Sequence, residues 1–524
     1  MTARRPGRVQ RIAYDATPLN STTPDIDARI GWLLAMSRLH HKEHVFQDGR
    51  QFVTAVSDAG FPASRSLVSR WESGEIPVSY EGMSAYESAL GLEPGRISSL
   101  TGYIRSAITG VNTRVIRPHL DPTSRDFARR LDELLDMAEE AQAFGRDWQE
   151  LGWHLAAVPH VHLRARTWEA LATQIVQLLP RAIRVPYRQY STAAMNIASI
   201  LRAQDFLVAA IDSYLAAPDV QVVLNPLGLL DRLPTREAAR IVLDMIDAPP
   251  TPAAFRLAVW LGAQKVARGD FSPEERSRLD MIVLRRWRAN PVKTGDELAE
   301  LIAGLPEGLR STLTNAATRA GRRKLGYVVE HGEELEATRA RAFSHDLAES
   351  ARSRTPQRPT YDEDKMLARL LPEGLFHRDS ERRHLAALLI SASPFGEPVT
   401  EEMLVLLART DLPGWVRVRA ATLVRYLSND THRMRMLGYL DDPDQDVATP
   451  IGQALGHLTF TAFTDQALRS SLSGEGTAAE QAKLYALGMT GSPGLEAITR
   501  STTSPPWQKS AARWWIATGP AIRS

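Results

Sequence analysis

Apolar residues recur every three to four positions along most of this chain, and this spacing constrains the fold more than any other feature. The apolar segments are separated by proline and glycine, and they are long enough to form helices. Strand patterns are nearly absent, because no sustained alternation of β-branched residues and no Asn-Gly hairpin occurs. The sequence therefore predicts an all-α fold.

The composition excludes several classes of protein. The 524 residues include no cysteine, which excludes disulfides, thiolate metal sites and cysteine nucleophiles. The formal net charge is +2, so any binding of nucleic acid must depend on a local basic patch. No stretch reaches the roughly 18 apolar residues of a membrane span, and the basic N-terminus is not followed by the apolar run of a secretory signal. We therefore expect a cytoplasmic protein without a membrane partner.

Polar breaks that contain proline divide the chain into four segments. Residues 1–24 are rich in arginine, threonine and proline, and we expect a disordered basic arm there. A compact set of five short helices is expected over residues 25–108. Longer helical segments follow over residues 124–350 and 365–524, which we expect to form an extended region of helical hairpins.

The last of these segments shows weak internal similarity. The pattern of Gly414–Leu427 returns in Pro506–Gly519, 92 positions later, and Asp442–Leu458 repeats it at an offset of 31. One such helix cannot bury its apolar face alone, so its neighbours must stack on it. The pattern resembles HEAT-type repeats over roughly residues 375–520 and implies an α-solenoid-like arrangement. An irregular helical domain is the alternative, because ordinary helical hairpins give similar spacing.

The segment from Ile30 to Ile97 has the pattern of a compact helical bundle. Ile30, Leu33 and Leu34 lie on one face of its first helix, which is expected to end near Leu39. The second helix is expected from about Gln51 to Gly60 and the third from Ser64 to Gly74; Met83, Tyr86 and Leu90 recur at helical spacing in the next.

Within this bundle, Val68–Gly74 (VSRWESG) is followed by Pro77 and by Ala89–Leu92 (ALGL). In order and spacing these residues resemble the Cro/repressor-type (XRE) helix-turn-helix family. The resemblance covers about 70 of the 524 residues. It implies a five-helix domain whose third helix enters the major groove of double-stranded DNA.

The residue types of the third helix agree with that role. Its exposed N-terminal half carries Arg65 and Ser66, and Ser69 and Arg70 follow one turn later. Arginine can donate two hydrogen bonds to guanine O6 and N7. Ser64 is a suitable N-cap for this helix.

By the resemblance, positions 65, 66 and 70 contact base edges, Gln51 contacts a phosphate, and Glu72 ties the third helix to its neighbours. Leu67, Val68 and Trp71 are expected to anchor the opposite face. The turn GFPAS is about two residues longer than the tight turn of the family, which leaves open whether Ser64, Arg65 or Ser66 reaches the bases.

Arginines of the N-terminal arm offer a second basic element. Such arms can enter the minor groove or lie on phosphates, and a solvated tail is the alternative. Two further basic clusters, at residues 285–288 and 319–324, are expected on solvated helix faces. The arm carries Arg4, Arg5, Arg8 and Arg11.

No chemistry-bearing motif is present elsewhere. The histidines of HHKEH, among them His40 and His44, and the group His154, His160 and His162 lack the ligand pattern of a metal site. No P-loop, GxSxG or strand-associated GxGxxG occurs. We therefore predict no enzymatic activity, no metal and no cofactor.

These observations predict a sequence-specific DNA-binding transcriptional regulator that acts as a homodimer. The helical region would support dimerisation and the sensing of a peptide, protein or small-molecule effector. The alternative is a helical-repeat adaptor whose N-terminal bundle docks proteins instead of DNA.

Overall fold

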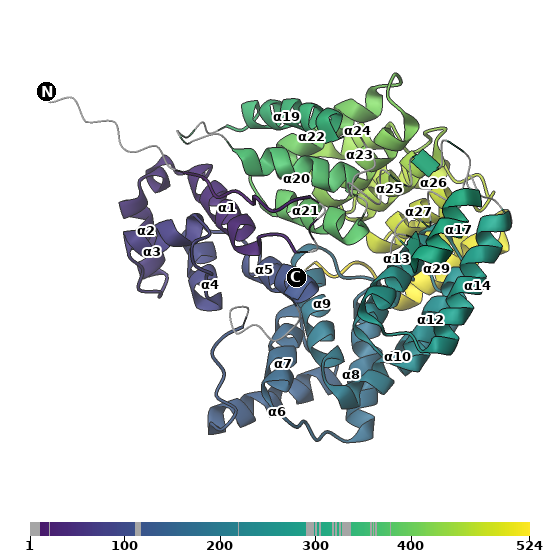
Figure 1. Cartoon of the computed structure of the whole chain (residues 1–524), viewed down its shortest axis with the longest axis horizontal. Coiled ribbons are helices and arrows are strands. Elements are labelled where there is room, and N and C mark those ends of the chain that lie inside the picture. The colour runs from purple at the N-terminus through teal and green to yellow at the C-terminus, as the bar shows by residue number, and fades with distance from the viewer. Residues whose placement is uncertain are drawn as a thin grey trace, which may run out of the picture. The chain divides into compact units, whose positions relative to one another are not determined.

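The computed structural model describes residues 11–109, 117–289, 305–316, 337–356 and 364–523, apart from positions 20, 22, 218 and 378, together with isolated positions between 298 and 361. Throughout these residues the chain is helical, and no β-strand is formed apart from isolated bridge pairings such as Ala182 with Ile522 (Figure 1). The prediction of an all-α fold is confirmed.

The chain forms two compact units that interleave along the sequence. The first unit contains residues 1–119, 335–377 and 381–494, and the second contains 120–334, 378–380 and 495–524. The predicted segment 365–524 is thus shared between the two units, because its last residues pack with the second.

In the first unit, helices α1 to α5 precede a longer series that begins at α19. Its helices are α1 (Ile26–Leu39), α2 (Gly49–Asp58), α3 (Arg65–Glu72), α4 (Tyr80–Ala89), α5 (Ser98–Thr109), α19 (Ala337–Ser353), α20 (Lys365–Phe376), α21 (Ser380–Ala392), α22 (Gly396–Ala408), α23 (Gly414–Leu427), α24 (Arg433–Leu437), α25 (Gln445–Gly456), α26 (Ala462–Ser470) and α27 (Ala478–Met489).

The second unit has its own apolar core, which includes Trp148 and Trp168. Its helices are α6 (Arg125–Glu139), α7 (Gly145–Ala157), α8 (Ala165–Leu178), α9 (Arg184–Ala198), α10 (Leu201–Ala216), α11 (Leu224–Leu229), α12 (Arg236–Asp247), α13 (Pro252–Arg268), α14 (Pro273–Ala289), α17 (Glu307–Ala316), α28 (Gly494–Arg500) and α29 (Pro506–Thr518).

Helix α1 is buried on all sides. Every residue from Ile26 to Leu39 except Asp27 is buried, including Arg29 and Arg38. Ile30, Leu33 and Leu34 are buried and the helix ends at Leu39, as expected, but the burial of the other faces was not predicted. The reason is that α1 packs between α3 on one side and side chains of α20 and of Phe395, which directly precedes α22, on the other (Figure 1).

A buried ion cluster joins α1 to α20. Arg29 donates two hydrogen bonds to the Glu373 carboxylate, at 2.9 and 2.7 Å, and its Nε donates to Asp15 at 2.7 Å. Arg382 of α21 donates to the same Glu373 carboxylate at 2.8 Å. These side chains are nearly inaccessible to solvent, so each charge depends on the others for stabilisation.

The N-terminal segment takes part in this packing. Asp15 is fully buried against Arg29, and Ile12 and Ala13 are buried as well. The expectation of a disordered arm over residues 1–24 therefore does not hold for residues 11–19, because the Asp15 carboxylate fixes that part of the chain. Arg11 is exposed, whereas Arg4, Arg5 and Arg8 lie outside the described residues.

Helices α23, α25 and α27 contact one another in chain order. Positions matched by the internal similarity are buried in both α23 and the α25 region: Val416, Ala420, Leu423 and Leu427 in the first, and Val447, Ile451, Ala454 and Leu458 in the second. Helix α29, which carries the third copy of the pattern, belongs to the second unit. The HEAT-type interpretation stays a prediction.

We predict that Glu373→Gln destabilises the first unit by about 3–5 kcal/mol, because it leaves buried arginines without their shared counter-charge. The free energy of unfolding is measured by urea denaturation followed by circular dichroism. Glu496→Gln is the matched control, since Glu496 forms an exposed pair with Arg500, and it should change stability by less than about 1 kcal/mol. An equal effect of the two substitutions would contradict the structural role of the cluster.

The same cluster predicts a pH dependence. Burial raises the pKa of Glu373, but the positive charges of Arg29 and Arg382 outweigh burial and lower this pKa from 4.5 to about 2. The resulting stabilisation is complete above the unfolded-state pKa and is lost as the pH falls from 4.5 towards 2. Urea midpoints at about pH 5, 4 and 3 should fall more steeply for the native chain than for Glu373→Gln. An equal pH dependence of the urea midpoints in the two proteins would refute the lowered pKa of Glu373.

Candidate nucleic-acid interface

Helix α3 begins and ends at residues that favour helix termini. The Ser64 side chain accepts a hydrogen bond from the Leu67 backbone N–H at 3.1 Å, so the predicted N-cap is confirmed. Gly74 follows the helix with φ of +70°, a conformation that glycine adopts readily. The helix therefore spans Arg65–Glu72, within the expected range.

The inner face of α3 is fixed by a buried polar contact. Glu72 accepts hydrogen bonds from Arg38 of α1 at 2.6 and 2.7 Å and from the Tyr86 hydroxyl of α4 at 2.8 Å. Val68 and Trp71 are buried beside it. The interpretation of Glu72 as a structural residue is confirmed. Its partner Arg38 was missed, because an arginine near the end of a helix is ordinarily solvated.

Two glycines permit α1 and the end of α3 to approach closely. A Cβ atom at Gly31 would lie 2.7 Å from the Gly74 nitrogen, and one at Gly74 would lie 2.7 Å from the Ala28 Cα atom. Any larger residue at either position would push α3 away from α1. The close approach fixes the position and the rotation of α3 relative to α1.

All six residues predicted to bind DNA are exposed. Five of them lie together at the N-cap and on the outer face of α3, and the sixth, Gln51, lies in the first turn of α2. A Cβ atom at Gly49 would lie 3.7 Å from Arg65 Nε, so the Arg65 side chain reaches the start of α2. The five are Ser64, Arg65, Ser66, Ser69 and Arg70.

Arg70 has a competing partner. Its Nε atom lies 3.0 Å from a Glu75 carboxylate oxygen, and the two side chains are 47% and 62% exposed. An exposed pair of this kind contributes at most about 1 kcal/mol, so a stronger acceptor can displace Glu75. The carboxylate holds the guanidinium near α3 and also reduces its positive potential.

The long turn before α3 is packed against the bundle. Phe61 places its ring 5.4 Å from the ring of Trp71, and its N–H donates to the Val56 carbonyl. The two additional residues thus support α3, and Gly60, with φ of +95°, turns the chain out of α2. The turn adds an apolar contact and leaves the outer face of α3 uncovered.

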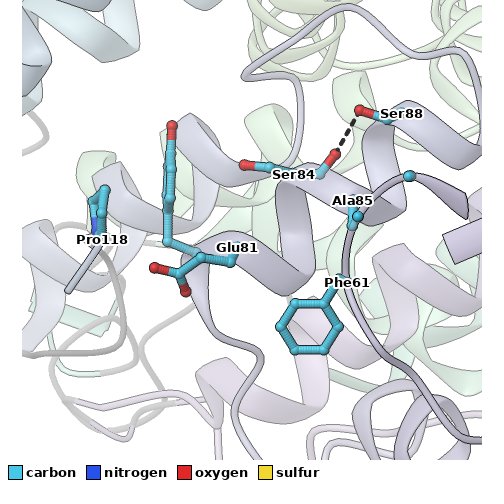
Figure 2. A pocket seen from close by; sticks show the side chains of 9 residues that line it. Phe61, Glu81, Ser84, Ala85, Ser88 and Pro118 are labelled. Atoms are coloured by element: carbon cyan, nitrogen blue, oxygen red, sulfur yellow. Dashed lines mark hydrogen bonds between the residues drawn. The ribbon is translucent and has the colours of Figure 1, made fainter. Parts of the chain in front are cut away.

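A hollow of about 310 Å³ lies beside this turn, between the end of α2 and helix α4. Figure 2 shows the Phe61 ring and the Glu81 carboxylate at its border, with Ser84, Ala85 and Ser88 along α4. The Ser88 hydroxyl donates to the Ser84 carbonyl at 3.0 Å. The lining carries a carboxylate and no basic side chain, so the hollow does not extend an anion-binding surface.

The histidines of HHKEH do not act together. His40 contacts the Tyr361 hydroxyl at 3.2 Å and lies edge-on to the Phe395 ring, away from His44, which is exposed. Burial and then the charge of Arg352 lower the pKa of His40 to about 4, so its ring is neutral at physiological pH. Within the described part of the chain, no cluster of histidine and acidic residues is arranged to hold a metal ion.

The other predicted clusters have mixed surroundings. His154 stacks on Phe127, whereas His160 and His162 are exposed. Arg286 packs over the Phe255 ring and donates to the Asp247 carbonyl. In the cluster 319–324, the described arginines Arg319, Arg322 and Arg323 are exposed, and Lys324 lies outside the described residues.

Comparison with known proteins gives no relative: no family model, no curated protein and no solved structure matches this chain. The resemblance of α3 to the XRE family therefore depends on the residues of α1 to α4 alone. Among the described helices, none has the length and apolar character needed to cross a membrane.

We predict that Glu72→Ala lowers the free energy of unfolding by about 3–5 kcal/mol, because it leaves the buried Arg38 guanidinium without its counter-charge. Arg65→Ala combined with Arg70→Ala should cost less than about 1 kcal/mol, since both side chains are exposed. Urea denaturation of the two variants measures the difference. A tolerated Glu72→Ala would show that this contact does not hold α3 in place.

Proposed function

We propose that the chain is a sequence-specific DNA-binding transcriptional regulator. The observation that carries the proposal is the contrast between the two faces of α3. The inner face is fixed by Glu72 and Trp71, and the outer face presents Arg65, Ser66, Ser69 and Arg70 to solvent. A rigidly seated helix with hydrogen-bond donors on its outer face fits the major groove.

Some residues of the outer face would contact bases and others would contact phosphates. Residues 65 and 69, and residues 66 and 70, are four positions apart, so each pair lies on one side of the helix. The Ser64 hydroxyl already accepts the cap hydrogen bond and can still donate its proton to a phosphate oxygen. Gln51, in the first turn of α2, is placed where the positive end of the helix dipole favours phosphate.

The proposal includes a homodimer in the cytoplasm, with the helical region setting dimer geometry and sensing an effector. Two copies of α3 held one helical turn of DNA apart would recognise a palindromic site. The rigid attachment of α1 to α20 supports such an arrangement, because it couples α3 to the rest of the first unit.

The alternative is a protein-docking adaptor, which the Arg70–Glu75 pair favours, since a mixed-charge surface suits a protein partner as well. The two functions differ in salt dependence and in the class of molecule captured. DNA binding weakens steeply with salt because counterions are released from the phosphates.

The test is DNA-affinity sequencing with a genomic fragment library, followed by fluorescence anisotropy on the enriched sequences at several salt concentrations. Arg65→Ala combined with Arg70→Ala should remove about 1–3 kcal/mol of binding free energy per lost base contact. It should also erase the enriched motif.

The control is Arg129→Ala combined with Arg500→Ala, whose side chains are 71% and 78% exposed in the second unit, and it should bind as the native chain does. If the Arg65/Arg70 variant binds the enriched DNA as tightly as the native chain, the proposal fails. Absence of any enriched DNA would favour the adaptor.

A further inference from the structure

Arg181 lies in the second unit, in the short connection between α8 and α9, and its side chain is half-buried. With the described residues, its side chain forms no hydrogen bond and no ion pair, and its Nε atom is fully buried without a partner. Burying a donor of a charged group without an acceptor is unfavourable, so proteins rarely keep one without a reason.

Arg181 differs from the other described arginines that have a buried nitrogen without a hydrogen bond. Five others also have a buried nitrogen that lacks a hydrogen bond, but each of them has a carboxylate or carbonyl partner. They are Arg105, Arg276, Arg286, Arg369 and Arg382. Arg181 thus differs from them in having no such partner among the described residues.

Two tyrosines near Arg181 cannot supply the missing negative charge. Burial raises the pKa of Tyr190 to about 12 and raises that of Tyr214 as well, although the positive charge of Arg181 acts in the opposite direction. Both hydroxyls are therefore protonated at physiological pH. Tyr214 donates to the Val222 carbonyl at 3.0 Å. Neither tyrosine therefore neutralises Arg181, and Asp147, whose negative charge also raises the pKa of Tyr190, lies 3.9 Å from Arg130.

The end of the chain is fitted around the guanidinium. The Ile522 N–H donates to the Arg181 carbonyl at 2.9 Å, and the Ile183 N–H donates to the Ile522 carbonyl at 3.2 Å. At Gly519, where φ is +90°, a Cβ atom would lie 2.8 Å from Arg181 Nη1. A glycine is needed for this approach, so the described part of the tail packs directly on the guanidinium.

The backbone beside Arg181 is also strained. Arg184 has φ of +54°, a left-handed conformation that is uncommon for residues other than glycine. Strain of this kind persists where the surrounding structure holds a local geometry in place, and it concentrates at ligand sites.

We propose that Arg181, with Tyr190 as a second donor, forms a binding site for a small oxyanion, either a carboxylate or a phosphate group. The guanidinium presents a planar fork of donors that matches two oxygens of such a group, and the protonated tyrosine supplies another donor. The bound anion neutralises a guanidinium that has no acceptor among the described residues. This site is in the second unit and does not depend on the proposed DNA interface.

The test is isothermal titration calorimetry of the full chain with inorganic phosphate and, separately, with acetate, at constant ionic strength. We expect saturable binding of one or both anions. Arg181→Gln should weaken it by at least about tenfold, because the charge-assisted hydrogen bonds are lost. Tyr190→Phe should weaken it less, by several-fold. The preferred anion identifies the class of ligand.

Two controls separate this site from other basic surfaces. Arg202→Gln, an exposed substitution on α10, should bind the anion as the native chain does. Arg65→Ala combined with Arg70→Ala should also leave anion binding unchanged, since these residues lie in the first unit. The proposal is overturned if the native chain binds neither anion saturably. It is also overturned if Arg181→Gln retains native affinity or if binding is lost only in the Arg65/Arg70 variant.

Discussion

The bidentate ion pair between Arg29 and Glu373 is the contact on which the arrangement of the first unit depends. It joins residues 344 positions apart, and both side chains are buried. Removing two charges from water is unfavourable unless the geometry is good and the other lone pairs are satisfied. Asp15 and Arg382 meet that condition, because they complete an alternating cluster of positive and negative groups. The cluster therefore selects one position of α1 on α20, where an apolar contact would tolerate several.

Helix α1 connects this cluster to the candidate interface. Arg29 near its start reaches α20, and Arg38 near its end reaches Glu72 of α3. Since α1 is rigid and buried throughout, the outer face of α3 keeps a defined orientation relative to α20. For the proposed regulator, this means that an effector acting on the first unit would have a physical route to α3 through α1, and a movement of α20 would be transmitted to the proposed interface.

The sequence predicted those features that depend on neighbouring residues. The N-cap Ser64, the anchors Val68 and Trp71 and the structural role of Glu72 all follow from the local pattern. It did not predict the burial of the rest of α1, because Ile30, Leu33 and Leu34 indicated only one buried face. Whether Arg29 is solvated or buried depends on a carboxylate brought to it from far along the chain, and no periodicity contains that information. The buried Nε atom of Arg181, which has no partner among the described residues, was missed for the same reason.

The modest net charge determines how the proposed interface can achieve specificity. A chain with a formal charge of +2 has no strong long-range attraction for DNA, and Glu75 further reduces the potential around Arg70. To accept two hydrogen bonds from Arg70, a base in the major groove must displace the Glu75 carboxylate. A mismatched base forms too few hydrogen bonds with Arg70 to displace it. At a matched site the free energy of the base contact is therefore reduced by the cost of breaking the Arg70–Glu75 pair, whereas a mismatched site leaves that pair intact. Because an exposed pair contributes at most about 1 kcal/mol and a good bidentate base contact about 1–3 kcal/mol, the proposed interface keeps a preference for the matched site.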